Sequence, residues 1–270
     1  RPTHEYLGFS AGLDFETKIM VKHNAADLLR QRLAAKNWLP QTIAMSGVTD
    51  PYQPIERKLQ ITRGCLAVLA ECLNPTVCIT KNHLITRDID LLKILAQAQA
   101  VTVYVSITTL EEEIRQKLEP RTSSPEQRLA AIQEISSNNI HVGVLVAPII
   151  PGLTDHQLPA ILTRAAKAGA KFAGHVPLRL PQGVKDLFIQ WLDQHFPHRK
   201  QKVLHQLQSL RGGKLNNSQF KERMQGEGIW AENMHKIFSL YCRKLGLKSG
   251  GPELSTANFK RPQTSQLDLF

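Results

Sequence analysis

The strongest constraint on the fold is a regular alternation, from residue 24 onward, of short apolar runs with amphipathic segments of helical length. Five runs are rich in the β-branched residues that favour strands, and they lie around 41–46, 76–80, 101–106, 141–147 and 171–177. Between them, apolar residues recur at helical spacing in segments that include 57–73, 87–99, 125–138 and 155–168. Strands that are apolar on both faces and alternate with helices are typical of parallel sheets. The alternation therefore predicts βα units that close toward a barrel.

The two ends of the chain modify this architecture. The sequence starts without Met, and its first residues show no signal-peptide pattern. We expect a sixth strand before Arg1, which makes the predicted fold an α/β partial (β/α)6 barrel that lacks its first strand. Polar and glycine-rich stretches interrupt the alternation after residue 197. We therefore predict the barrel over 1–197, a helical appendage over 198–248 and a flexible tail over 249–270.

Composition narrows the class of protein. The chain has 34 basic and 23 acidic residues, and the resulting net charge of +11 favours a polyanionic partner such as nucleic acid. No apolar run approaches the ~18 residues that a membrane span requires, so we predict a cytoplasmic protein without a membrane partner. The spacing of the cysteines fits neither a zinc site nor a disulfide framework. We interpret them as buried free thiols; they are Cys65, Cys72, Cys78 and Cys242.

Polar residues follow each predicted strand directly. In a parallel barrel the reacting groups come from the carboxyl ends of the strands. Here these ends carry hydroxyl groups, a lysine and glycine-containing turns, over residues 46–52, 80–83, 106–109, 147–152 and 175–179. The set suits a zwitterionic ligand with a ribose, because Lys81 can pair with a carboxylate while hydroxyl and backbone groups bind an ammonium and a sugar. Taken singly, each Ser or Thr could instead cap the helix that follows it.

These segments together resemble a known family. Residues 1–200 are similar to radical S-adenosylmethionine (radical SAM) enzymes of the spore photoproduct lyase-like group, also described as DNA repair photolyase-like. In that superfamily a CxxxCxxC loop holds a 4Fe–4S cluster, which binds S-adenosylmethionine and cleaves it to a 5′-deoxyadenosyl radical. In that group a segment like residues 1–8 follows the loop. The resemblance thus implies cluster cysteines upstream of Arg1, no metal ligand in this chain, and no cofactor cleavage by the chain alone. It also implies a reductant such as flavodoxin or ferredoxin.

The resemblance assigns a set of cofactor-binding residues, which are Ser46, Gly47, Thr49, Lys81, Ser106 and Ala147. The segment from Ser46 to Asp50 matches the part that supports the methionine moiety, with Thr49 at the position of a cofactor-contacting Ser in the lyases. Lys81 matches a lysine that approaches the cofactor carboxylate. Ser106 matches a serine on the ribose side, and Ala147 matches the strand end that lies along the adenine.

The catalytic residues are not assigned by this resemblance. The lyases carry a hydrogen-donating Cys two residues before the cofactor-contacting Ser, but this chain has Gly47 there, which has no thiol. Arg179 matches a loop that faces DNA in the lyases, although Leu180 replaces the aromatic residue of that loop. Tyr52 lies near the predicted rim. Arg179 and Tyr52 are therefore the candidate substrate contacts.

Several functions remain open at this point. The first is a radical SAM enzyme that acts on nucleic acid, in the manner of DNA lesion repair. The second is a basic nucleic-acid-binding module without catalysis, and the third is a radical SAM enzyme that modifies a protein or a small molecule. A metal-dependent hydrolase built from Asp50 and strand-end histidines is disfavoured, because no HxH pair occurs and His141 begins its strand.

The last residues indicate a protein partner. The segment Gln266-Leu267-Asp268-Leu269-Phe270 resembles the peptide by which bacterial replication and repair proteins dock on the sliding clamp. Leu269 and Phe270 would fill an apolar pocket, and Gln266 would hydrogen-bond at its rim. The alternative is that this terminal pair folds back onto the barrel.

Overall fold

The chain folds around a parallel sheet in which each strand pairs with the next strand of the sequence. The computed structural model describes residues 5–10, 12, 14, 17–45, 49–181, 183–215 and 226–262. The six strands of the sheet are β1 (Ile43–Met45), β2 (Thr76–Thr80), β3 (Val101–Ser106), β4 (Val142–Ile149), β5 (Phe172–Pro177) and β6 (Lys248–Ser249). This topology confirms the α/β class with a parallel sheet. The predicted runs 76–80 and 101–106 coincide with β2 and β3.

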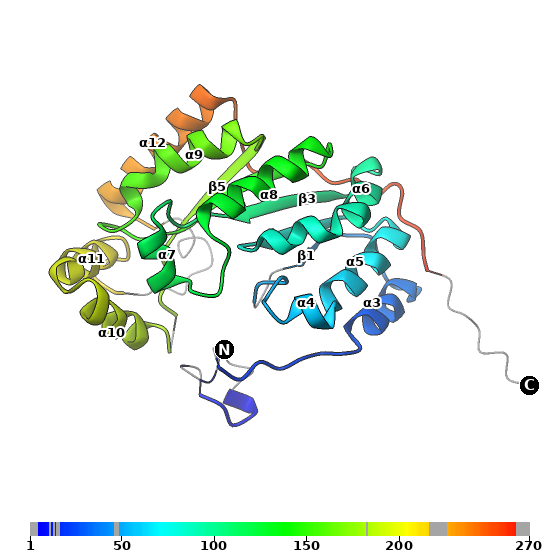
Figure 1. The fold of residues 1–270 in the computed structure, drawn as a ribbon, viewed down its shortest axis with the longest axis horizontal. Helices are drawn as coiled ribbons and strands as arrows, with labels where there is room; N and C mark the ends of the chain where they lie inside the picture. Colours follow the sequence, from blue (N-terminus) through cyan, green and yellow to red (C-terminus); the bar gives the residue numbers. More distant parts are fainter. Residues whose placement is uncertain are drawn as a thin grey trace, which may run out of the picture.

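Helices connect the strands and cover the sheet (Figure 1). The α-helices are α3 (Ala25–Ala34), α4 (Glu56–Leu59), α5 (Ile61–Cys72), α6 (Ile89–Gln97), α7 (Glu112–Leu118), α8 (Pro125–Ser137), α9 (Leu158–Lys167), α10 (Lys185–His195), α11 (Pro197–Ser209) and α12 (Gly228–Leu245). Two 3-10 helices, η1 (His83–Asp88) and η2 (Asp155–Gln157), precede α6 and α9. Helix α7 was not expected from the sequence, because its seven residues carry mostly charges and only Ile114 and Arg115 are buried.

Four of the βα units end their helices in the same way. The residues after α5, α6, α8 and α9 that adopt a left-handed backbone conformation are Leu73, Gln99, Asn139 and Gly169. In each unit the next amide N–H bonds back to a carbonyl of the last helical turn, as in Asn74 N to Leu69 O and Ala100 N to Leu95 O. Of these four positions, only position 169 requires glycine for steric reasons, since a Cβ there would lie 2.4 Å from Ser136 Oγ. This repeated cap sends each helix directly into the following strand.

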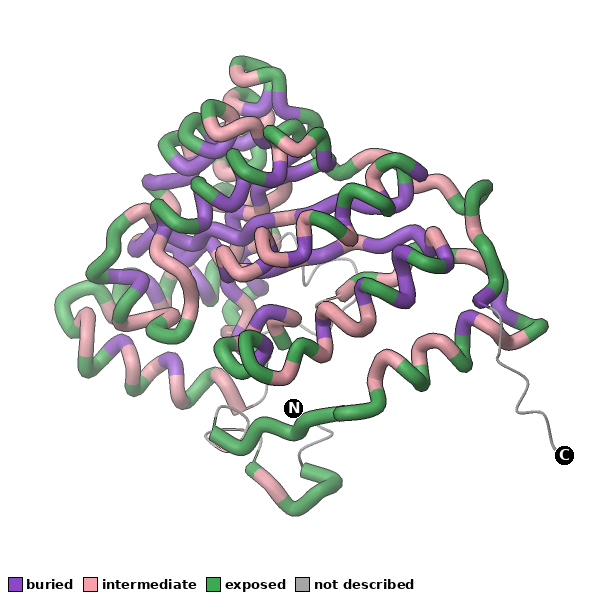
Figure 2. Tube along the Cα trace, turned by 45° about the vertical axis from the view of Figure 1, so that its right-hand side comes forward, coloured by how far each residue is buried: buried purple, intermediate pink, exposed green. Residues whose placement is uncertain are grey.

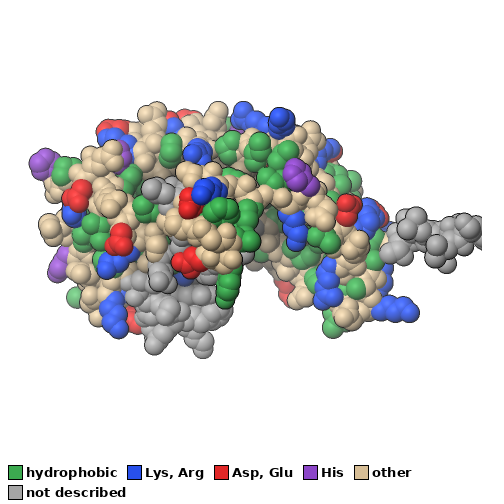
Figure 3. Space-filling model, turned by 90° about the horizontal axis from the view of Figure 1, so that it is seen from below, with side chains coloured by type: hydrophobic (Ala, Val, Ile, Leu, Met, Phe, Trp, Pro, Cys, Tyr) green, Lys and Arg blue, Asp and Glu red, His purple; other side chains and the backbone are tan. Residues whose placement is uncertain are grey.

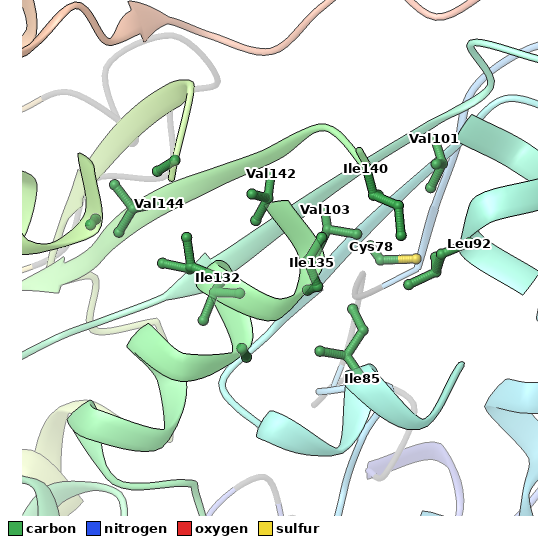
Figure 4. Close-up of a cluster of buried hydrophobic side chains, with 14 of the residues drawn as sticks. Cys78, Ile85, Leu92, Val101, Val103, Ile132, Ile135, Ile140, Val142 and Val144 are labelled. Carbon is green, nitrogen blue, oxygen red and sulfur yellow. The ribbon is translucent and has the colours of Figure 1, made fainter. Parts of the chain in front are cut away.

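The core lies between the sheet and the helices that cover it. Figure 4 shows side chains of β2, β3 and β4, among them Cys78, Val103 and Val144, packed against Leu92 of α6 and Ile135 of α8. All five are fully buried. In Figure 2 the buried trace follows the strands and the sides of the helices that face them. A second cluster joins α10 and α11 to the ends of β4 and β5, through Phe188, Leu192, Val203, Ile150 and Leu178.

The structure corrects the expected plan after residue 197. The sixth strand of the sheet comes from the carboxyl-terminal part of the chain, where Lys248 pairs with Phe172 of β5. Helix α12 packs against α9 and leads into β6, so part of the predicted appendage contacts the βα units of the sheet. A two-residue strand carries too little pattern to be found in a sequence. A further strand before Arg1, next to β1, stays a prediction.

Residues 250–262 contact the ends of the βα units, whereas the sequence predicted a flexible tail over 249–270. We call this segment the C-terminal strap. Its amides of Ser255 and Lys260 donate to Gln99 O and Cys72 O at 2.9 and 2.8 Å. The guanidinium of Arg261 donates to the carbonyls of Ala35, Lys36 and Trp38. All these acceptors precede strands. The strap therefore crosses the amino-terminal ends of the strands, while residues 263–270 lie outside the described part of the chain.

Among the residues that the structure describes, no helix has both the length and the apolar character needed to cross a membrane.

Helix α6 allows a matched test of the core. Leu92 is fully buried and Ile94 of the same helix is 46% exposed. Leu92→Ala is expected to lower the free energy of unfolding by about 2–5 kcal/mol, because it removes buried methyl groups and leaves a cavity. Ile94→Ala should change it by roughly 0.5 kcal/mol or less. Urea denaturation followed by circular dichroism measures both, and equal effects would contradict the assigned packing of α6.

Candidate functional site

A cleft of about 500 Å³ opens at the carboxyl ends of the strands. Its lining comes from the ends of β2, β3, β4 and β5 and from the loop after β1, and it comprises Thr49, Asp50, Ile79, Thr80, Lys81, Ser106, Leu145, Ala147, Pro148, Val176, Pro177, Leu178 and Arg179. Figure 3 shows the molecule hollowed between the half that carries α10 and α11 and the half that carries α3. The predicted positions Thr49, Lys81, Ser106, Ala147 and Arg179 therefore share one cleft. Ser46 and Gly47 lie outside the described residues.

Asp50 holds the loop after β1 to the end of β2. One of its carboxylate oxygens accepts from Thr80 Oγ1 at 2.7 Å and from the Tyr52 amide at 2.8 Å. The other accepts from the amide of Lys81 at 2.7 Å. These bonds satisfy the carboxylate and fix the backbone at Lys81, because hydrogen bonds to a charged group are strong. From the sequence, Asp50 was the end of the segment that supports the methionine moiety, or a metal ligand in the disfavoured hydrolase alternative. The structure shows it organising the cleft.

The side chain of Lys81 belongs to a buried ionic network. Its ammonium pairs with Oε1 of Glu119 and donates to Thr108 Oγ1 at 3.2 Å. The second carboxylate oxygen of Glu119 accepts from Arg128 Nη2 at 2.8 Å. Arg128, which is 1% exposed, also donates to the backbone oxygens of Ser106 and Ser123, each at 2.9 Å. The network thus ties the ends of β2 and β3 to α8.

This network leaves a positive charge in the cleft. Burial alone would raise the pKa of Glu119, but Lys81 and Arg128 stabilise its carboxylate and lower the pKa to about 2. One carboxylate then faces two cations. The surplus positive charge lies next to the cleft, where the side chain of Lys81 stays 25% exposed. A ligand carboxylate can pair with it there. Neither Glu119 nor Arg128 was singled out from the sequence, because each is distant from Lys81 along the chain.

Two hydroxyl groups at the end of β3, those of Ser106 and Thr108, bond to the backbone that lines the cleft. Ser106 Oγ donates to the carbonyl of Ala147 at 2.9 Å. Thr108 Oγ1 lies 2.9 Å from the same carbonyl and 2.9 Å from Glu119 Oε1. Because the Ser106 proton points to Ala147, the lone pairs of Ser106 Oγ can accept from a ligand hydroxyl. The ladder between β4 and β5 is irregular between Val146 and Ile149, so the backbone around Ala147 and Pro148 leaves the sheet pairing where it lines the cleft.

Two arginines mark the edge of the cleft at β5. Arg179 lines it, and Arg211 is 4% exposed and donates to Leu178 O at 2.8 Å. Burial and the nearby charge of Arg179 both lower the pKa of Arg211. Two guanidinium groups in proximity favour an anion at this edge. Arg179, a candidate substrate contact, therefore lies at an edge of the cleft that carries positive charge.

Tyr52, the other candidate substrate contact, is fully buried. Its hydroxyl donates to Asp88 Oδ2 at 3.1 Å, and Asp88 is also paired with Arg63 and Arg87. Burial raises the pKa of Tyr52 well above its usual value. The residue has no surface left for a substrate. The sequence suggested a contact only because Tyr52 follows the rim segment, and packing against η1 turns it inward.

A second cavity, of about 720 Å³, shares Ile79 and Leu145 with the cleft and extends to α12. His175 of β5 lies in it, with its ring 4.3 Å from that of Phe238 between centroids. Burial, with a smaller effect from His235, lowers the pKa of His175 to about 4, so the imidazole is neutral at physiological pH. Within the described ranges no group of three His, Cys, Asp or Glu side chains could hold a metal ion. The hydrolase alternative gains no support.

The cysteines do not form a cluster site. Cys78 of β2 is fully buried between the sheet and the helices (Figure 4), and burial raises its pKa to about 12. Cys65, Cys72 and Cys242 lie on helices, and burial raises the pKa of each. None lines the cleft described above. Raised thiol pKa values oppose the thiolate form that binds iron. The predicted cysteines upstream of Arg1 stay a prediction.

Fold and cleft together define a class. A parallel βα sheet with a lysine, hydroxyls and an irregular strand end at its carboxyl edge is suited to a small zwitterionic ligand. The model of the radical SAM superfamily matches residues 14–165, and the chain belongs to this superfamily. The cofactors of the family are a 4Fe–4S cluster and S-adenosylmethionine.

The sequence relatives are similar over most of the chain. An uncharacterized protein of Mycobacterium tuberculosis is 37% identical over 73% of this chain and 58% of its own length. An uncharacterized protein of Methanocaldococcus jannaschii is 31% identical over 51% of this chain and 49% of its own length. The chain thus spans about three fifths of the length of the mycobacterial relative.

Solved structures share the fold at low sequence identity. A spore photoproduct lyase complexed with dinucleoside spore photoproduct is similar with a TM-score of 0.52 and 14% identity, over 86% of this chain and 67% of that chain. SuiB of Streptococcus suis, bound to S-adenosylmethionine, is similar with a TM-score of 0.53 and 11% identity, over 85% of this chain and 43% of that chain. These likenesses agree with the family membership.

Glu119 gives a test of the ionic network. Glu119→Gln is expected to lower the free energy of unfolding by about 3 kcal/mol at neutral pH, because it leaves two cations without their shared carboxylate. The folded-state pKa of Glu119 is depressed, so its contribution is present above the ordinary value of 4.5 and is lost as the pH falls toward about 2. Urea denaturation at neutral pH and at successively lower pH should show the two proteins converging.

The control for this measurement is Glu113→Gln, which removes a carboxylate of α7 whose side chain is 78% exposed. It should leave the free energy of unfolding nearly unchanged, because exposed ion pairs contribute little. A gap between Glu119→Gln and the unaltered protein that stays constant with pH would contradict the buried network.

Proposed function

We propose that the protein binds S-adenosylmethionine in the cleft at the carboxyl ends of the strands and performs radical chemistry on nucleic acid. The observation that carries the cofactor site is the convergence of Lys81, Ser106, Thr49 and Ala147 on one cleft from four separate βα units. Positions distant along the chain meet at the edge where parallel barrels place their reacting groups.

Each residue has a specific part in this proposal. Lys81 pairs with the carboxylate of the cofactor, helped by the surplus positive charge of the network around Glu119. Ser106 accepts from a ribose hydroxyl, and Leu145, Ala147 and Pro148 form an apolar wall for the adenine. Thr49 faces the methionine end of the cofactor. Ser46 and Gly47, which are assigned to the same end, lie outside the described residues. When bound with its cluster, the cofactor supplies hydrogen abstraction by a carbon radical. The chain contributes binding, orientation and exclusion of water.

Three features support nucleic acid as the substrate. The net charge is +11, and Arg179 with Arg211 gives one edge of the cleft a positive charge. The lyase neighbour was solved with a dinucleoside photoproduct. A lesion-repair reaction with a donor unlike the lyase cysteine fits best, because Gly47 offers no thiol and no described cysteine lines the cleft. Modification of a protein or a small molecule, and nucleic-acid binding without catalysis, are the alternatives that experiments must separate.

Two further partners belong to the proposal. A reductant such as flavodoxin or ferredoxin would supply the electron that the family's chemistry requires. The segment from Gln266 to Phe270 would dock on a sliding clamp through Leu267, Leu269 and Phe270. The strap ends beside Trp38, at the amino-terminal ends of the strands. A clamp bound beyond residue 262 would therefore leave the cleft open at the opposite end of the barrel.

The role of Lys81 is tested by comparing two ligands. Lys81→Met is expected to lower the affinity for S-adenosylmethionine about tenfold or more, because it removes a charged hydrogen-bond donor. Affinity for methylthioadenosine, which has the ribose and adenine but no carboxylate, should stay unchanged. Calorimetric titration of a protein that includes the native flanking sequence and its cluster measures both. Equal losses for the two ligands would mean that the cleft itself is disrupted.

Lys93→Met is the matched control for Lys81→Met, since Lys93 is an exposed lysine of α6 away from the cleft. It should bind both ligands like the unaltered protein. An unchanged affinity of Lys81→Met for S-adenosylmethionine would contradict the proposed site.

The substrate class is tested by cofactor turnover. The cluster-containing protein, under anaerobic reduction, is expected to release 5′-deoxyadenosine from S-adenosylmethionine, and damaged DNA should increase the rate. Arg179→Ala should abolish the increase and keep the basal release. Release that DNA does not affect would favour a protein or small-molecule substrate. No release with a fully loaded cluster would favour a binding module.

A further inference from the structure

A cavity of about 650 Å³ lies outside the cofactor cleft, between α11, α12 and the start of α9. We call it the α11 cavity, and its lining comprises Gly152, Asp155, His156, Pro159, His198, Arg199, Lys202, Met234 and Ile237. One side is basic, with Arg199 and Lys202 on the first two turns of α11. The other side is apolar, with Pro159 of α9 and Met234 and Ile237 of α12. Such a division suits a ligand with an anionic group attached to a flat or apolar body.

The basic side is open to an anion. Within the described residues, neither Arg199 nor Lys202 forms an ion pair, whereas Lys200 of the same turn is bound to Asp193. Helix α11 has thirteen residues, no acid in its first turn and no side-chain cap at Phe196. Its positive end and the two cations therefore reinforce each other at the cavity.

The carboxylate of the lining is already satisfied. One oxygen of Asp155 accepts from Trp230 Nε1 at 3.1 Å, and the other from the amide of His156 at 3.1 Å. The bond from Trp230 attaches α12 to η2 beside the cavity. With Asp155 engaged, two cations face one anion, so the lining carries a net positive charge before the imidazoles are counted.

The loop after β4 connects the cavity to the cofactor cleft. Pro148 lines the cleft and Gly152 lines the cavity, and the four steps of chain between them span at most about 14 Å. The loop is rigid, because Ile150 and Leu153 are fully buried and Thr154 Oγ1 accepts from the Ile150 amide. Gly152 has a φ of 73°, and a Cβ there would lie 2.7 Å from Gln206 Oε1 and 3.4 Å from Lys202 Cγ. This close approach sets α11 against the loop.

We propose that the α11 cavity binds the phosphate of a nucleotide, with Arg199 and Lys202 on the phosphate and the base or sugar against Met234 and Ile237. The choice of a nucleotide rests on the proposed function. The site is separate from the cofactor cleft. It would hold one nucleotide of a nucleic-acid strand while a neighbouring part of the same nucleic acid lies near Arg179. Phosphate contacts of this kind position a nucleic acid without reading its sequence.

The experiment uses the 270-residue chain and two probes, a fluorescent single strand of about 12 nucleotides, which is within the range of single-strand site sizes, and thymidine monophosphate. The cavity variant is Arg199→Ala with Lys202→Ala. The control variant is Lys93→Ala with Lys171→Ala, which removes two exposed cations elsewhere. Anisotropy is measured over a series of salt concentrations, and calorimetry measures the mononucleotide. Thermal melts check that both variants fold.

The cavity variant is expected to bind the strand about tenfold more weakly. The slope of log affinity against log salt should fall by about 1.4, as two lost contacts to single-strand phosphates predict. The control should lose much less. If thymidine monophosphate binds as tightly as the single strand, and the cavity variant loses this binding, the result supports the site with a free nucleotide as its ligand. Equal losses in both variants, or no loss in the cavity variant, would overturn the proposal.

These outcomes are independent of the cofactor site. Neither Arg199 nor Lys202 lines the cleft, so titration of S-adenosylmethionine into the cluster-containing cavity variant should give the affinity of the unaltered protein. Loss of strand binding with intact cofactor binding then bears on the α11 cavity alone. Failure of the proposed function would instead appear in the Lys81 measurements.

Discussion

The burial of Glu119 between Lys81 and Arg128 is the interaction on which the site depends. A carboxylate in the interior is costly unless it is paired, and here the two cations come from the end of β2 and from α8. Arg128 reaches past Glu119 to the backbone of Ser106, so the pairing also fixes the end of β3. The position of the cleft lysine is thus determined by a network that no ligand needs to touch. The helices can vary in their outer faces while the geometry at the cleft is kept.

Two carboxylates, those of Asp50 and Glu119, hold different parts of the cleft in place. Asp50 fixes backbone, by accepting the amides of Lys81 and Tyr52, and Glu119 fixes side chains. Behind them, Asp88 receives Arg63, Arg87 and the hydroxyl of Tyr52, which joins the loop after β1 to η1. Each of these three acids is satisfied by groups from different βα units. The units therefore share polar as well as apolar contacts, and these contacts hold the ends of the strands together around the cleft.

The sequence predicted the periodic parts of the structure well. The runs 76–80 and 101–106 became β2 and β3, and Lys81, Ser106 and Ala147 met in one cleft because strand ends of a parallel sheet share an edge. Prediction failed where the contact partner is distant along the chain. Tyr52 was placed at the rim, because nothing local indicates its bond to Asp88. The strap was taken as flexible, since its Gly and Pro residues suggest a linker, although carbonyls at Cys72 and Gln99 hold it. Arg128 gave no signal, because its role exists only in the folded state.

The strap also determines when, during synthesis of the chain, some contacts of the folded protein can form. Arg261 caps carbonyls of Ala35 and Lys36, residues that leave the ribosome more than two hundred positions earlier. The amino-terminal units therefore gain these contacts only after a segment more than two hundred residues further along the chain has been synthesised. Until then the carbonyls of Ala35, Cys72 and Gln99, which precede β1, β2 and β3, lack their partners in the strap. Such long-range closure is slow, since a large loop must be ordered first. The strap thus adds its long-range contacts at the end of the strands opposite the cleft.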